Sequence, residues 1–147
     1  AQFEKLRTVN GELHMLGKHL DGYRRAFTDF VDFDMSPDGL KGVKQKSTCQ
    51  SNGPAFTKVD TSDDSALLVS HFLPRNGDGS HAMMVVSCDD PHDRATKTHW
   101  VTFRADDYEV ASVDGAGKAE MARGADGSYS FPIRSNAAML VIARCRK

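Results

Sequence analysis

The sequence predicts an α+β fold in which one long N-terminal amphipathic helix packs on a largely antiparallel meander sheet. Apolar residues between positions 6 and 30 recur alternately three and four residues apart, which is the period of one helix face. They are Leu6, Val9, Leu13, Leu16, Leu20, Tyr23, Phe27 and Phe30. From residue 66 onwards, short apolar runs alternate with turn residues, which is typical of strands. We expect the 147 residues to form a single domain, with a helix over 1–34, an irregular connection over 35–65 and a sheet over 66–147.

The predicted helix needs a partner surface for its apolar stripe. Gly11, Gly17 and Gly22 each cost about 1 kcal/mol relative to Ala, so the helix is not stable alone. The same spacing is typical of a coiled-coil seam with another chain. Tyr23 and Phe27 are bulky for such a seam and suit a sheet surface better. We therefore expect the helix to pack on the sheet of its own chain.

Strand signals recur from residue 66 to the C-terminus. They lie at 66–73, 81–88, 98–104, 108–113, 118–122, 128–133 and 138–145. The first two runs are joined by Pro, Asn, Asp and Gly residues that favour a hairpin. The runs 81–88 and 138–145 are apolar on both faces, which predicts central strands of the sheet. Between helix and sheet, residues 41–64 have little periodic signal and predict a long connection over the sheet.

Composition excludes several classes of protein. The apolar fraction of 39% and the charged fraction of 27% are those of a soluble globular domain. The 19 basic and 20 acidic residues nearly balance, which argues against nucleic-acid partners, since these require a basic excess. No apolar run is long enough for a membrane span in this chain. The composition predicts no cofactor, and the expected partner is another protein.

The N-terminus and the cysteines favour export, to the periplasm, the cell surface or the medium. Ala1 followed by Gln2 is what cleavage of a signal peptide leaves, although a chain cut from a longer one would begin in the same way. The three cysteines allow one disulfide. We predict a bond between Cys49 and Cys88, with Cys145 as the alternative partner of Cys49. Reduced cysteines acting as small apolar residues are the other interpretation.

Two histidines are weak candidates for catalysis. His81 and His99 fall in predicted strands, and a histidine pair on one sheet can serve as general acid and base or bind zinc. Six histidines in a chain of this length also meet by chance. No nucleophile elbow, zinc-protease helix or phosphate-binding loop motif is present. The sequence therefore specifies no reaction.

The segment after the strand at 81–88 holds the densest cluster of potential metal ligands. Asp89, Asp90, His92 and Asp93 could bind a divalent cation through carboxylate and imidazole groups. Asp and Pro are also ordinary turn formers in solvated loops. The turn interpretation is favoured, because metal sites usually gather ligands from distant segments. No metal is predicted, and these residues are its weak candidates.

Trp100 and Arg104 are the candidate binding residues. They share one face of the alternating run 98–104, and both residue types are frequent in binding hot spots. If the helix leaves this face open, it forms a recognition patch. The alternative is that Trp100 packs beneath the connection at 41–64.

The predicted order of helix, long loop, antiparallel sheet and late cysteine resembles the head domain of type IV pilin subunits. Cystatin-like and other helix-on-sheet folds have the same order. The resemblance implies a non-catalytic exported or cell-envelope protein that acts through protein–protein contacts, such as an assembly subunit, an inhibitor or a surface antigen. The alternative is a small secreted hydrolase that uses the sheet histidines, with or without a metal.

Overall fold

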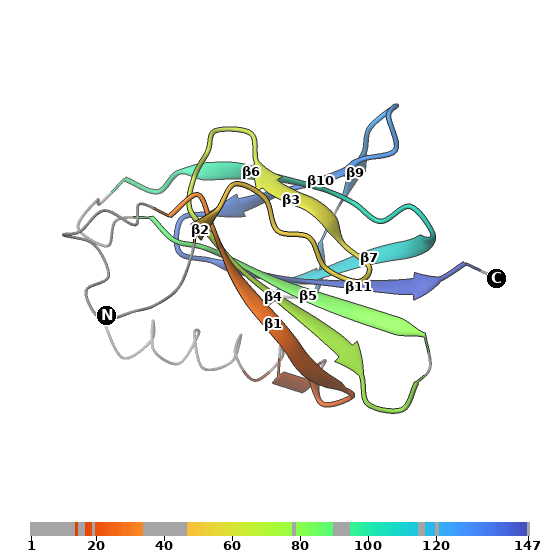
Figure 1. Cartoon of the computed structure of the whole chain (residues 1–147). Helices are drawn as coiled ribbons and strands as arrows, with labels where there is room; N and C mark the ends of the chain where they lie inside the picture. Colours follow the sequence, from red (N-terminus) through yellow and green to blue (C-terminus); the bar gives the residue numbers. More distant parts are fainter. Residues whose placement is uncertain are drawn as a thin grey trace.

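The computed structural model describes residues 14, 17–18, 20–33, 47–77, 79–89, 95–114, 117–119 and 121–146. Within these residues the chain forms two β-sheets that lie face to face (Figure 1). The larger sheet has seven strands in the order β2-β1-β4-β5-β11-β7-β8, and the smaller has four in the order β3-β6-β10-β9. The described part of the chain is therefore a two-layer β-sandwich.

The larger sheet is antiparallel except where β2 pairs with β1. In chain order its strands are β1 (Tyr23–Val31), β2 (Ser47–Thr48), β4 (Leu67–Pro74), β5 (Ser80–Ser87), β7 (Tyr108–Asp114), β8 (Gly117–Ala119) and β11 (Ala138–Cys145). The smaller sheet is antiparallel throughout. Its strands are β3 (Thr57–Thr61), β6 (Thr98–Arg104), β9 (Ala122–Arg123) and β10 (Tyr129–Arg134).

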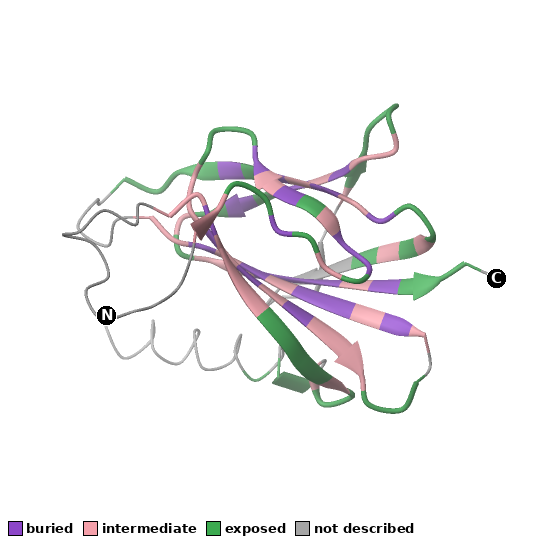
Figure 2. Ribbon diagram, viewed as in Figure 1, coloured by how far each residue is buried: buried purple, intermediate pink, exposed green. Residues whose placement is uncertain are grey.

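The main core lies between the two sheets, and buried residues alternate with less buried ones along strands such as β4, β6 and β10 (Figure 2). From the larger sheet come Val31, Leu67, Val69, Met83, Val85, Met139, Val141 and Ala143. From the smaller sheet and the segment before it come Ala55, Phe56, Val59, Val101, Phe103, Tyr129, Phe131 and Ile133. The Phe103 ring is at the centre, because it contacts the rings of Phe56, Tyr129 and Phe131.

The predicted long N-terminal helix is wrong. Its second half is strand β1, which pairs with β4 along its whole length. The described residues before Asp21 are His14, Gly17, Lys18 and Leu20, whose backbone is helical but which are too few to define a helix. The rest of the predicted helix over 1–34, namely residues 1–13, 15, 16, 19 and 34, lies outside the described residues. The α+β class is therefore replaced by an all-β arrangement in the part of the chain that the structure describes.

The composition of β1 and one irregularity explain the error. Its aromatic and β-branched residues favour extended backbone. Pairing with β4 shifts register between Arg25 and Phe27, so that Ala26 has no partner on β4 and forms a β-bulge. As a result, Phe30 lies opposite Leu68 on the outer face, and Phe27 lies opposite His71 on the inner face. Spacings of three and four thus arise in a strand whose alternation is interrupted.

The resemblance to pilin head domains and to cystatin-like folds required a long helix before the sheet. Because that helix is not present in the described residues, the resemblance no longer holds. The predicted connection over 35–65 is also partly wrong, because it contains strands β2 and β3. Residues 35–46 of that connection lie outside the described residues. The predicted strands 66–73, 81–88, 98–104 and 138–145 match β4, β5, β6 and β11, and β5 and β11 are neighbours in the middle of the larger sheet as expected.

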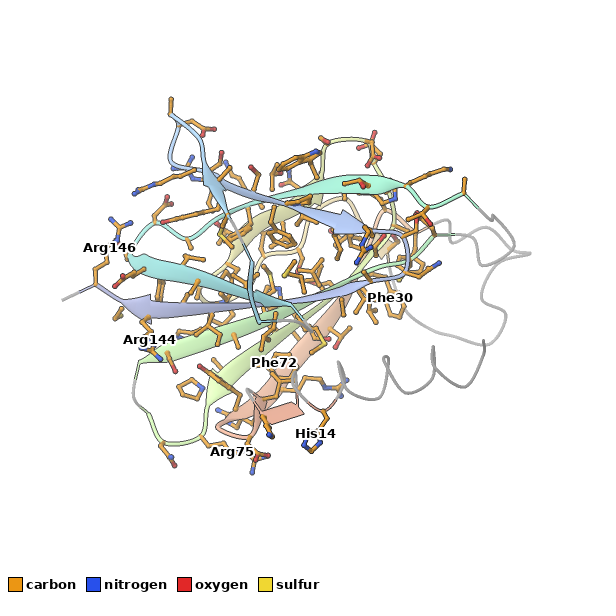
Figure 3. The ribbon with its side chains drawn as sticks, turned by 180° about the vertical axis from the view of Figure 1, so that it is seen from behind. His14, Phe30, Phe72, Arg75, Arg144 and Arg146 are labelled. Atoms are coloured by element: carbon orange, nitrogen blue, oxygen red, sulfur yellow. The ribbon has the colours of Figure 1, made fainter. Side chains whose placement is uncertain are left out.

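The outer face of the larger sheet carries a second apolar cluster. Ala82 and Leu140 are its buried centre, with exposed fractions of 1% and 0%. Partly buried side chains surround them: Leu20, Tyr23, Phe72, Met84, Ala138 and Ile142. Figure 3 labels Phe72 and Phe30 on two strands of this sheet, with Arg144 and Arg146 at the far end of β11. Apolar side chains on both faces explain why β5 and β11 have no clean alternation.

Candidate functional site

At one end of the sandwich, the imidazole of His99 is held between two carboxylates. His99 is in β6 and is 4% exposed. Its Nδ1 lies 2.7 Å from Oδ2 of Asp63, and its Nε2 lies 2.7 Å from Oδ2 of Asp89. A carboxylate can only accept a hydrogen bond, so both ring nitrogens donate and the ring is a cation.

The partners of His99 come from three connections between the two sheets. Asp63 and Ser65 lie between β3 and β4, and the Ser65 hydroxyl donates to Asp63 at 2.7 Å. Asp89 follows β5 and accepts a short hydrogen bond from the hydroxyl of Ser135, which lies between β10 and β11. One buried cation therefore joins the β3–β4, β5–β6 and β10–β11 crossovers.

Hydrogen bonds set the charge states of this cluster. The bond to Asp89 raises the pKa of His99 above its ordinary value; burial opposes this and the bond to Asp63 adds to it. Burial alone would raise the pKa of Asp63, but its bonds with Ser65 and His99 lower it to about 2. Burial would likewise raise the pKa of Asp89, but its hydrogen bonds with Ser135 and His99 lower that pKa below its ordinary value.

This arrangement leaves His99 without a lone pair for catalysis or metal binding. The predicted pair with His81 does not form, because β5 belongs to the larger sheet and β6 to the smaller one. The His81 ring instead contacts the ring of Tyr108 edge-on, with centroids 5.5 Å apart. Between β5 and β6 the chain crosses from the larger sheet to the smaller one. The alternation of apolar and polar residues cannot reveal such a crossing.

The predicted metal ligands are only partly described. The Asp89 carboxylate is occupied by His99 and Ser135, so it does not act as a ligand in this arrangement. Asp90, His92 and Asp93 lie outside the described residues. The turn interpretation and the metal interpretation therefore remain predictions for those three positions.

A second buried histidine was missed by the sequence reasoning. His71 in β4 is 1% exposed, and its Nε2 lies 2.7 Å from the hydroxyl of Ser51. That hydroxyl donates to Oδ2 of Asp29 at 2.7 Å, so Nε2 of His71 is the donor to Ser51. Burial lowers the pKa of His71 to about 4, against the opposing charge of Asp29. The ring is therefore neutral at physiological pH.

Ser51, His71 and Asp29 are the residue types of a nucleophilic triad in the wrong order. In such a triad the histidine lies between the acid and the serine, where it can remove the hydroxyl proton. Here the serine lies in the middle, and it is 0% exposed. The arrangement therefore links β1, β4 and the segment before β3 and has no access to a substrate.

Three carboxylates gather beside the edge of the smaller sheet. Ligand atoms of Asp32, Asp60 and Asp64 lie within 4.8 Å of one another, the one such group among the described residues. Burial raises the pKa of Asp32 to about 6, and the carboxylates of Asp60 and Asp64 add to the shift. Oxygen atoms in this arrangement are suited to a hard divalent cation. A proton retained on Asp32 also relieves the repulsion between the carboxylates. Acidic groups of this kind are common without an ion, so the cluster assigns no metal.

Replacing Asp32 with Asn should stabilise the protein at pH 8 and leave it unchanged at pH 4. The pKa of Asp32 is higher in the folded protein than its ordinary 3.8, so its ionisation reduces stability as pH rises from about 4 through about 6. Screening by solvent limits the gain to about 1 kcal/mol. Asn also suits the positive φ of 54° at this position. Thermal unfolding at both pH values measures the effect, with Asp107→Asn as the control in an exposed turn. An equal gain at both values would contradict the raised pKa.

The Trp100 surface is the exposed face of the smaller sheet around Trp100, Pro132, Arg104 and Arg134. Trp100 is 47% exposed and lies opposite Pro132 of β10. Arg104 lies further along β6 and donates to the backbone oxygen of Asp126 and to Asp106, both at 2.9 Å. Arg134 is exposed at the end of β10. Nearly half of the surface of Trp100 is open, so the described part of the connection, 47–64, does not cover the side chain.

The predicted disulfide is not present. Cys49, Cys88 and Cys145 are all unpaired. Cys49 follows β2 and Cys88 follows β5, three strand positions apart in the larger sheet. That separation is about 14 Å, twice the Cα–Cα distance that a disulfide spans. Cys145 ends β11, which runs antiparallel to β5, so it lies at the opposite end of the sheet from Cys88.

Comparisons with protein-family models, curated proteins and solved structures gave no match to this chain. No helix among the described residues has the length and apolar character needed to span a membrane. The candidate site therefore stands on its own geometry.

Proposed function

We propose that this domain is non-catalytic and acts by binding another protein through the Trp100 surface. The observation that carries the proposal is the exposure of Trp100, which at 47% is the most exposed large apolar side chain among the described residues. A tryptophan on a flat sheet face gives a large, rigid contact area at little cost in conformational entropy. The residues around it are typical of a binding hot spot, where aromatic and arginine side chains are enriched.

Charge favours a partner whose contact surface has an acidic rim. Arg134 lies opposite Thr98, next to the Trp100–Pro132 pair on the same face. Arg104 lies on the other side of Trp100 along β6, and its partner Asp106 is itself exposed. A second copy of this chain would bring like charges together across a two-fold axis, which is unfavourable. A different protein that offers carboxylates around an apolar centre fits better.

Among the described residues, no observation favours the hydrolase alternative. The rings of His71 and His99 are buried at 1% and 4% exposure, and their hydrogen bonds stay within the protein. A general base needs to reach the proton that it removes. Export of the protein stays a prediction, and the unpaired cysteines remove one of its two arguments.

Site-directed photo-crosslinking in cells tests the proposal. A photoreactive amino acid at Pro132, directly opposite Trp100, should yield one discrete adduct with another protein. The same residue at the exposed Glu109 of β7, in the other sheet, should not yield that adduct. With the cross-linker at Pro132, Trp100→Ala should weaken binding about 30-fold, which corresponds to a hot spot of about 2 kcal/mol.

Two outcomes would contradict the proposal. One is the absence of a discrete adduct from Pro132, and the other is an adduct that persists unchanged in Trp100→Ala. Trp100 is the single tryptophan of the chain, so its fluorescence reports on this surface directly. Once the partner is purified, binding should shift the emission to shorter wavelength, because contact removes water from the indole.

A further inference from the structure

The contacts of His99 tie three sheet-to-sheet crossovers to one side chain. Asp63 holds the β3–β4 crossover, Asp89 holds the β5–β6 crossover, and Ser135 reaches the same carboxylate from the β10–β11 crossover. Backbone hydrogen bonds support the same junction: the Ser135 amide donates to Lys97, and the Ser87 amide donates to Ala137. Two further bonds join the β5–β6 and β10–β11 crossovers: the Asp89 amide donates to Oδ1 of Asn136, and the Lys97 amide donates to the hydroxyl of Ser135. Among the described residues, the side chains of the β3–β4 crossover meet the other two crossovers through the imidazole of His99.

We propose that His99 is a pH-operated latch that joins these three crossovers while its ring carries two protons and lets them open locally when it loses one. A neutral imidazole has one N–H, so it can donate to Asp63 or to Asp89 but not to both. The other ring nitrogen then presents a lone pair to a carboxylate 2.7 Å away, which is repulsive. Losing one proton therefore breaks the contact with one carboxylate. At Nδ1 the hydroxyl of Ser65, 2.9 Å away, can donate to the neutral ring only by giving up its bond to Asp63.

Among the described residues, the charged groups around the His99 ring are two carboxylates and one ammonium group. Asp63 faces the ring from the β3–β4 crossover, and Asp89 faces it from the end of β5. Lys97, just before β6, adds a positive charge near Asp89. Two hydroxyls complete the surroundings without titrating: that of Ser65 faces the ring, and that of Ser135 faces the Asp89 carboxylate. The two carboxylates thus determine the direction of the response.

The latch is complete at low pH and is lost as pH rises through the raised pKa of His99. The pKa of His99 is higher in the latch than its ordinary 6.5, so the stabilisation is complete below about 6.5 and is lost as pH rises through the folded value. The pKa of Asp63 is lowered to about 2, so acid disrupts the latch only between about 3.8 and about 2. The crossovers should be most firmly closed between about pH 4 and pH 6.5.

Opening should stay local, because His99 is near the start of β6 and the apolar core beyond it is built from other side chains, Val101 and Phe103 on the same face of β6 among them. It should extend to the backbone of Trp100, whose oxygen accepts a hydrogen bond from the Ser62 amide in the β3–β4 crossover at 3.1 Å. The latch does not depend on the proposed function, since it concerns the unbound protein.

Hydrogen exchange of the wild-type protein between pH 5 and pH 9, corrected for intrinsic exchange rates, tests the latch. The opening equilibrium of amides at 62–65, 87–89 and 135–137 should rise up to tenfold per pH unit above 6.5 and level off above the pKa of His99. Amides in the middle of β5 and β11 should not follow this rise. NMR titration of the His99 ring nitrogens should give the same midpoint, above 6.5.

The variant His99→Gln is neutral at every pH, so its crossover amides should exchange quickly and without this pH dependence. The wild-type measurements decide the question even if this variant does not fold. The latch is disproved by a His99 midpoint at or below 6.5 or by crossover protection that is constant through that midpoint. Equal loss of protection in the crossovers and in β5 and β11 would indicate global unfolding and would disprove it too.

Discussion

Phe103→Ala should lower the free energy of unfolding by about 3–5 kcal/mol, a large part of the total stability of a domain of this size. The Phe103 side chain is 1% exposed and lies in the core between the two sheets. It stacks on Tyr129 with centroids 5.4 Å apart and meets the edges of Phe56 and Phe131 at 5.7 and 6.1 Å. Truncation removes all three contacts and leaves a cavity that rigid strands cannot close. Urea unfolding followed by circular dichroism measures the loss.

Trp100→Ala is the matched control, because Trp100 lies on the same strand and faces outward. Nearly half of its surface is exposed, so its truncation should change stability by about 0.5 kcal/mol or less. Similar losses from the two substitutions would contradict the assignment of the two faces of β6. Trp100→Ala is also the variant that should lose binding, so its normal stability is needed to interpret the cross-linking experiment.

Gly53→Ala should destabilise the protein by about 3 kcal/mol, through overpacking against a buried ring. A Cβ atom at this position would lie 2.1 Å from Nδ1 and 2.5 Å from Cε1 of His71. The ring cannot move away, because its Nε2 is bonded to Ser51 and its face contacts the ring of Phe27 at 4.8 Å. The thermal midpoint should fall by roughly 10 °C or more.

Gly22→Ala is the control for Gly53→Ala, since a Cβ at Gly22 would meet no atom within 4 Å. That substitution should be close to neutral. A second test combines Gly53→Ala with His71→Ala, which removes the ring that the new methyl group meets. The double variant should be more stable than the sum of the two single losses predicts. Strict additivity would show that contact with His71 is not the cause.

The strands that the sequence predicts best are those whose side chains obey one simple rule. β6 alternates buried and exposed residues because one face meets the core and the other is the Trp100 surface. β11 is apolar on both faces because it lies mid-sheet between the main core and the outer cluster. Local pattern and tertiary environment agree at these strands, and the predicted bounds match the observed ones.

The prediction of an N-terminal helix failed because a helix face and a strand with a β-bulge can both place apolar residues three and four positions apart. The bulge at Ala26 places Tyr23 and Phe30 on the outer face of the sheet and Phe27 on the inner face. A pattern of apolar residues cannot distinguish this from a helix face when the alternation is interrupted. The aromatic and β-branched content of the segment was the signal for a strand, and the longer helical pattern outweighed it.

The candidate site was predictable only where it lies on a single strand. Trp100 and Arg104 share one face of β6, so alternation alone brings them together. The cluster of His99 gathers residues from positions 63, 89 and 135, and that of His71 gathers residues from positions 29 and 51. These contacts depend on how the chain passes between the sheets, which no local pattern contains. Asp63 and Asp89 are common turn residues and gave no sign of a charged partner.

Among the described residues, strand β1 forms most of one border of the larger sheet, since β2 pairs only with Phe30 and Val31. A straight border with free backbone groups offers a template on which another molecule can add a strand and start a fibre. The bulge at Ala26 breaks the regular spacing of those groups, and Arg24 and Arg25 add positive charges that resist close approach. The bulge at Ala26, which gave this segment the apolar spacing of a helix, should thus also protect the folded protein against aggregation.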